Sequence, residues 1–191
     1  MRRTPVLLVM ALSLAACSSG GSSATPGPSV SPTIEGVKVF TGLSHDHLKK
    51  GEYPQTYEQS PPVGGPHSPA WLVCQAYQSD LPKENAVHSE EHGGVWITYR
   101  PDLDPAAIAT LEGKVILNKE FVLVSPYVGQ TADVVVSTWG LQLTPTNAAD
   151  PRIDAFVRQY AGGDQGGEKG VGCASNGVSL AKALAFDASQ K

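Results

Sequence analysis

Methionine and positive charge are scarce in this sequence, and each shortage excludes a class of protein. Only two of the 191 residues are methionine, and both lie within the first ten residues, which argues against a methionine-rich carrier of Cu(I). Charged residues make up 17% of the chain, and 14 basic against 18 acidic side chains give a net charge of −4. A general nucleic-acid binder needs an excess of Lys and Arg to neutralise phosphates, so the composition excludes nucleic acid as a partner.

Long hydrophobic stretches and familiar catalytic motifs are absent as well. The apolar run over residues 6–14 is too short to cross a bilayer. The sequence contains no P-loop, no G-x-G-x-x-G after a predicted strand and no G-x-S-x-G elbow. What is present is a hydrophobic content of 41%, too high for a wholly disordered chain, in a length that suits one domain.

The N-terminus has the three parts of a secretory signal. Arg2 and Arg3 form a positive start, residues 6–14 are apolar, and Ala15 and Ala16 precede Cys17. Small residues before a cysteine at the cleavage point resemble a bacterial lipobox. We therefore expect residues 1–16 to be a lipoprotein signal peptide and Cys17 to carry lipid, which would anchor the protein to the extracytoplasmic side of the cell membrane. The alternative is an ordinary signal peptide that contains a cysteine.

Beyond the signal the chain divides into three stretches. Residues 17–35 are rich in Ser, Gly and Pro, a composition that favours a disordered tether. We expect a folded α+β domain over residues 36–161 and a Gly-rich C-terminal tail over residues 162–191. Outside the cytoplasm Cys74 and Cys173 would form a disulfide that ties this tail down, and the alternatives are a free buried thiol and thiolate ligation.

Strands and helices are mixed along the folded part. Runs of β-branched and aromatic residues predict strands, and an Asp-Pro pair marks the start of two helices. The strands are expected at residues 37–40, 94–100, 121–125, 133–139 and 141–143, and the helices at residues 82–93, 104–112 and 150–161. This order favours a small single domain of the α+β class, with a mainly antiparallel sheet and two or three short helices on one face.

All five histidines lie between His45 and His92. His88 and His92 are four residues apart, so a helix would place them on one face, at a spacing that can clamp a metal ion. A proline-stiffened loop would present His67, and His47 or His45 would complete the set. Imidazoles with a carboxylate suit a divalent transition metal such as Zn(II) or Cu(II). The alternative is that these are surface or hydrogen-bonding histidines.

His88, Glu91 and His92 also match the H-x-x-E-H string of inverzincin proteases, in which the glutamate acts as general base on zinc-bound water. That fold carries the string on a long helix, whereas Gly93, Gly94 and a predicted strand follow it here. We therefore favour a protein that is not an enzyme, and we assign no catalytic residues.

Several motifs together resemble those of a known family. They are Tyr53-Pro54, Pro61-Pro62-x-x-Gly65-Pro66-His67, Trp71, Glu84-Asn85-Ala86-Val87-His88-Ser89-x-Glu91-His92-Gly93-x-Val95, Tyr99-x-Pro101, Ser125-Pro126-Tyr127 and Trp139-Gly140. They are similar to motifs of the bacterial extracytoplasmic family catalogued as domain of unknown function 3105. The resemblance implies no established activity. It marks His67, His88, Glu91 and His92 as motif positions, whereas His45 lies outside the matched motifs, as does His47.

The leading hypothesis is a lipid-anchored extracytoplasmic domain that binds a transition metal. His67, His88 and His92 would be ligands, with Glu91 as a ligand or as the partner of one, and with His47 as a fourth. The alternative is a structural or interaction module of the cell envelope, in which the Pro-rich loop and the histidines form a hydrogen-bonded brace without metal. A metal-dependent hydrolase is the least favoured hypothesis. The one partner that the sequence indicates is the membrane, through lipid on the N-terminal cysteine.

Overall fold

The strands form where β-branched and aromatic residues concentrate, and the helices begin where the sequence offers a cap. The computed structural model describes residues 34–168 and 171–191. Asp104 begins one helix, because its side chain accepts hydrogen bonds from the backbone N–H groups of Ala106 and Ala107, and Asp150 caps a second helix in the same way through Arg152. In chain order the elements are β1 (Lys38–Val39), α1 (Lys83–Glu91), β2 (Val95–Tyr99), α2 (Pro105–Glu112), the 3-10 helix η1 (Gly113–Leu117), β3 (Val122–Pro126), β4 (Val134–Thr138), β5 (Leu141–Leu143), α3 (Pro151–Tyr160), α4 (Cys173–Asn176) and α5 (Leu180–Gln190).

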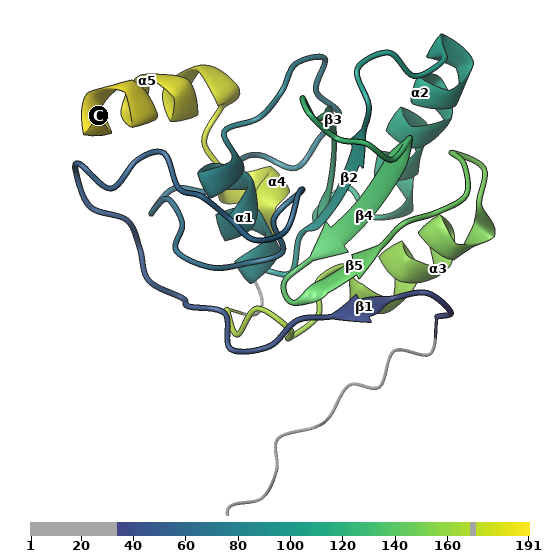
Figure 1. Ribbon diagram of the computed structural model, residues 1–191, viewed down its shortest axis with the longest axis horizontal. Helices are drawn as coiled ribbons and strands as arrows, with labels where there is room; N and C mark the ends of the chain where they lie inside the picture. Colours follow the sequence, from purple (N-terminus) through teal and green to yellow (C-terminus); the bar gives the residue numbers. More distant parts are fainter. Residues whose placement is uncertain (1–33, 169–170) are drawn as a thin grey trace, which may run out of the picture. The chain divides into compact units, whose positions relative to one another are not determined.

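The five strands form one sheet in the order β1-β5-β4-β2-β3, as Figure 1 shows. Ile97 in β2, which lies between β4 and β3, is opposite Val136 of the antiparallel β4 and Val124 of the parallel β3. The other pairs, β4 with β5 and β1 with β5, are antiparallel. The parallel pair is connected through α2 and η1, since two parallel strands need a crossover between them. The predicted α+β class and the mainly antiparallel sheet are confirmed.

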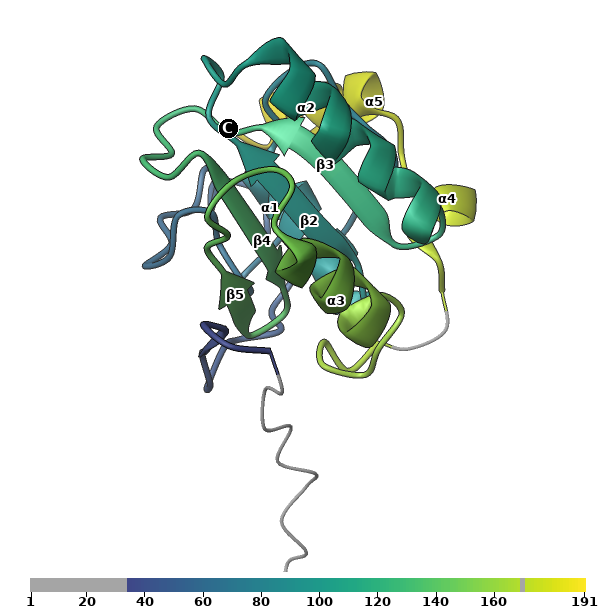
Figure 2. The same ribbon diagram turned by 90° about the vertical axis from the view of Figure 1, so that its right-hand side faces the viewer.

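Helices cover both faces of this sheet, although we expected them on one. Figure 2 shows α2 and α3 across one face, with α1 on the other side. Ile97 packs with Phe156 of α3 in the first core, whereas its neighbour Trp96 packs with Ala86 of α1 and Cys173 of α4 in a second core. The reason lies in the strands, because every residue of β2, β3 and β4 is buried and both faces therefore need a cover.

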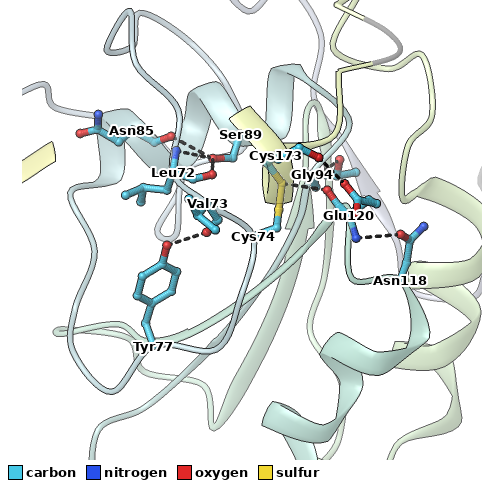
Figure 3. The surroundings of a disulfide bond; sticks show 12 residues. Leu72, Val73, Cys74, Tyr77, Asn85, Ser89, Gly94, Asn118, Glu120 and Cys173 are labelled. Carbon is cyan, nitrogen blue, oxygen red and sulfur yellow. Dashed lines mark hydrogen bonds between the residues drawn. A yellow bond between two sulfur atoms is a disulfide. The ribbon is translucent and has the colours of Figure 1, made fainter. Parts of the chain in front are cut away.

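The C-terminal part contains helices α4 and α5, which the sequence analysis treated as a Gly-rich tail. Ser179 caps α5 by accepting a hydrogen bond from the N–H of Lys182. Figure 3 shows the disulfide between Cys74 and Cys173, whose Cα atoms are 5.1 Å apart across 99 residues. The N–H of Cys173 also donates to the carbonyl of Glu120 at 2.9 Å, just before β3. The C-terminal segment is therefore held both covalently and by hydrogen bonds.

Some predictions concern residues before Ile34. The signal peptide of residues 1–16, Cys17 and the tether as far as residue 33 lie outside the described residues. Within residues 34–168 and 171–191, no helix has the length and hydrophobicity needed to cross a membrane.

Candidate metal centre

Helix α1 brings three of the candidate ligands onto one face. His88, Glu91 and His92 are spaced i, i+3 and i+4, and His92 is the C-cap residue directly after α1, so their side chains project from neighbouring positions. All three side chains are buried. Burying three polar side chains together costs folding free energy unless they have hydrogen-bond partners or bind an ion. The residues around them therefore determine what this helix face can bind.

The Pro-rich segment supplies His67, and the stretch before this segment supplies His47. The two residues form an isolated parallel β-bridge, in which the N–H of Leu48 donates to the carbonyl of His67 at 2.8 Å. The segment is fastened to α1 by the side-chain amide of Asn85, which donates to the hydroxyl of Ser68 at 3.0 Å. Residues that are far apart in the sequence therefore meet at the helix face that carries His88 and Glu91.

Four side chains converge at this place. One ligand atom from each of His47, His67, His88 and Glu91 lies within 4.8 Å of the others, and we refer to these residues as the four-residue group. Oε2 of Glu91 is 2.9 Å from Nε2 of His67 and 4.0 Å from Nε2 of both His88 and His47. Ligands about 2.1 Å from a tetrahedral zinc ion lie roughly 3.4 Å from one another. One of the separations in the four-residue group is shorter than this value and two are longer, so small movements of the side chains would fit them to a zinc ion.

Backbone carbonyls fix the orientation of two of the rings. Nδ1 of His67 donates to the carbonyl of Gly65 at 2.9 Å, and Nδ1 of His88 donates to the carbonyl of Ser68 at 2.6 Å. Because a carbonyl oxygen only accepts, Nδ1 carries the hydrogen in both rings, and the lone pair of each neutral ring is then at Nε2. Nε2 of His67 lies 2.9 Å from the carboxylate of Glu91, whereas Nε2 of His88 lies 4.0 Å from that carboxylate and 3.0 Å from Nε2 of His92.

The charge states favour cation binding. Burial lowers the pKa of His88 to about 3, and the neighbouring ring of His67 adds to this effect, so His88 is neutral near pH 7. Burial acts to raise the pKa of Glu91, but the adjacent rings of His67 and His45 outweigh it and lower this pKa to about 2. Among the described residues, neither Nε2 of His67 nor Oε2 of Glu91 has a hydrogen-bond partner of good geometry. A lone pair and a carboxylate oxygen 2.9 Å apart require a cation between them, either a proton or a metal ion.

His45 holds the second carboxylate oxygen of Glu91. Its Nδ1 lies 2.5 Å from Oε1, and its ring stacks on Trp139 with centroids 4.4 Å apart. On the other side, the ring of Trp71 contacts His92 with centroids 4.3 Å apart. His45 is therefore placed to orient Glu91, and two tryptophans enclose the histidines.

His92 belongs to a second group, which includes a residue that the sequence analysis missed. Nε2 of His92 lies 3.0 Å from Nε2 of His88 and 3.2 Å from Oε2 of Glu168. We refer to His88, His92 and Glu168 as the three-residue group. Glu168 lies in the Gly-rich segment before α4, where no spacing relative to a histidine could have indicated it.

The structure thus brings together all five residues that the sequence suggested as ligands, but in two overlapping groups. The disulfide occupies both Cys74 and Cys173, so neither offers a thiolate ligand. A cavity of about 520 Å³ lies elsewhere, between Tyr53, the start of α1 and α5, and none of its described lining residues belongs to the two groups.

Among known protein families, one matches most of the folded part of the chain. The family model described as "Protein of unknown function (DUF3105)" matches residues 48–175. The chain belongs to this family. The DUF3105 match includes His67, His88, Glu91 and His92, and it begins one residue after His47. No curated protein and no solved structure matches the chain.

Proposed function

We propose that this DUF3105 protein binds one divalent transition-metal ion, Zn(II) or Cu(II), through the four-residue group. The observation that carries the proposal is the pairing of Nε2 of His67 with Oε2 of Glu91, which are 2.9 Å apart and buried. In His67 and in His88, Nδ1 is hydrogen-bonded to a backbone carbonyl, which leaves Nε2 of each ring as the atom that can bind a metal ion. Outer partners of this kind commonly orient the ligands of metal sites.

The donor set suits these metals. Neutral imidazoles and one carboxylate are typical ligands of Zn(II) and Cu(II), whereas Ca(II) and Mg(II) prefer oxygen ligands alone. A metal ion would bring one further advantage, since it would replace the proton that the His67–Glu91 contact otherwise requires. A brace without metal would use the same two backbone hydrogen bonds, with a proton between Nε2 of His67 and Oε2 of Glu91 in place of the ion.

We also propose that the protein acts at the outer face of the cell membrane. The disulfide suggests an oxidising compartment outside the cytoplasm. Lipid on Cys17 would supply the anchor. Mass spectrometry of the N-terminal peptide of the membrane fraction tests this: we expect a chain that begins at Cys17 and carries fatty-acyl groups. A mature chain with an unmodified thiol at this position, or one that begins elsewhere, would contradict the proposed anchor.

Metal analysis of the purified protein tests the proposed binding. After incubation with excess Zn(II) and removal of free metal, we expect one zinc per chain by plasma mass spectrometry. His67→Ala combined with His88→Ala should abolish this zinc, and Glu58→Gln, which changes an exposed carboxylate that belongs to neither group of candidate ligands, should retain it. Sub-stoichiometric zinc in the wild type, or zinc that survives in the double variant, favours the brace.

A further inference from the structure

The three-residue group adds a second way to hold an ion beside the first. His92 is buried and lies 3.0 Å from His88, whereas half of the Glu168 side chain is exposed, at 51%. The two nitrogen atoms and the carboxylate oxygen lie within 4.8 Å of one another. Two imidazoles and a carboxylate form a recognised set of zinc ligands, which leaves a fourth coordination position open.

His88 belongs to both groups but has only one lone pair to offer. Its Nδ1–H donates to the carbonyl of Ser68, so Nε2 alone can bind a metal. The two groups therefore compete for one atom, and only one of them can use His88 at a time. We propose that they are two alternative positions of a single metal ion, which passes between them without leaving His88. This inference rests on the proposed function.

The ligands of the two groups indicate which group holds the ion more tightly. The four-residue group offers four ligands, whereas the three-residue group offers three and requires His92 to carry its hydrogen on Nδ1. Within the part of the chain that the structure describes, this Nδ1 is buried and has no hydrogen-bond partner. An unpartnered buried N–H costs free energy, so an ion at the three-residue group is held less tightly. The open coordination position there is where water or an incoming chelator can bind.

The segment that carries Glu168 is fixed against the rest of the domain. The side-chain amide of Gln165 donates to the hydroxyl of Thr138 at 3.0 Å and to the carbonyl of Tyr160 at 2.7 Å. Gly166 packs so closely on Glu91 that a side chain at this position would collide with the Glu91 backbone. Glu168 is thus held beside α1 by its neighbours, and its carboxylate is placed to receive an ion from His88 and His92.

Metal-transfer kinetics on the full chain test this inference. Zinc-loaded wild type, Glu168→Gln and His92→Gln would be mixed with excess EDTA, and zinc release followed by stopped flow. We expect one zinc per chain in all three proteins, with release slower in the two variants than in the wild type, because each variant removes a ligand of the group through which the ion would leave. Glu58→Gln, the matched exposed control, should release zinc at the wild-type rate.

The possible failures are distinguishable. Release rates equal to the wild type in both Glu168→Gln and His92→Gln would overturn the inference and leave the proposed function intact. Two zinc ions per wild-type chain would also overturn it, because His88 cannot serve both groups at once. No bound zinc in the wild type would overturn the proposed function and this inference together.

Discussion

Glu90 is the most deeply buried acid of α1, and replacing it with glutamine should stabilise the protein at neutral pH. Its side chain is fully buried, and the hydroxyl of Ser137 donates to Oε1 at 2.6 Å. Oε2 has no hydrogen-bond partner within residues 34–168 and 171–191. Burial raises the pKa of Glu90 well above its usual value, and the Ser137 hydrogen bond only partly opposes this effect. The folded protein therefore holds Glu90 protonated under conditions in which the unfolded chain ionises it.

The size of the effect follows from this difference in protonation. A glutamate in the unfolded chain has a pKa of about 4.3. While the folded state keeps the proton, each pH unit above this value lowers the free energy of unfolding by about 1.36 kcal/mol, so the loss at pH 7 is at most about 3–4 kcal/mol. Because the pKa is raised on folding, the native state is favoured at low pH, and this contribution is lost as pH rises from the unfolded value towards the folded one. Glu90→Gln has no carboxyl group to ionise and so avoids this loss of stability. The variant should therefore be more stable than the wild type at pH 7 and about as stable as the wild type near pH 4.

Urea unfolding with the disulfide intact and with chelator present measures this gain. The free energy of unfolding would be compared at pH 7 and pH 4 for wild type, Glu90→Gln and the exposed control Glu58→Gln. The control should match the wild type at both pH values. If Glu90→Gln is no more stable than wild type at pH 7, or if it gains as much at pH 4 as at pH 7, the assignment of a buried protonated acid is wrong.

Three further predictions concern stability, and urea unfolding measures each of them. Replacing Cys74 and Cys173 together with alanine opens a loop of 99 residues, and chain entropy predicts a loss of about 4–5 kcal/mol, so a loss below about 1 kcal/mol would contradict the role of the disulfide. Asp104→Ala removes the cap of α2 and should cost about 1 kcal/mol, most of which Asp104→Asn should restore. Gly166→Ala should cost about 1–3 kcal/mol, because its methyl group collides with the backbone of Glu91, and wild-type stability in this variant would refute the close packing.

Local sequence patterns predicted most of the fold. The runs of β-branched and aromatic residues at Val95–Tyr99 and Val134–Thr138 and the Asp-Pro helix starts at Asp104 and Asp150 identify elements that the structure contains at nearly the expected positions. Helix α5 was not predicted, because the whole C-terminal segment was interpreted as a Gly-rich tail, although Ser179 offers a cap for it. Helices on both faces of the sheet could have been predicted. The strands have few polar residues, and a strand that is buried on both faces needs packing partners on each face.

The sequence could predict only those parts of the candidate site whose residues are close together along the chain. The spacing of His88 and His92 along one helix placed both on one face, and the structure agrees. The position of His67 depends on its bridge to His47 and on a hydrogen bond to Gly65, and the bridge joins segments 20 residues apart that no periodicity connects. Glu168 comes from still farther along the chain, so it required the structure.

The most direct test of the central claim is the coordination shell of the bound metal. X-ray absorption at the zinc edge, on the purified protein loaded with one equivalent of Zn(II), would measure it. We predict nitrogen and oxygen ligands at about 2.0–2.1 Å with the scattering pattern of three imidazoles, from His47, His67 and His88, and no sulfur. A shell without imidazole, or one with sulfur at about 2.3 Å, would contradict a metal site in the four-residue group.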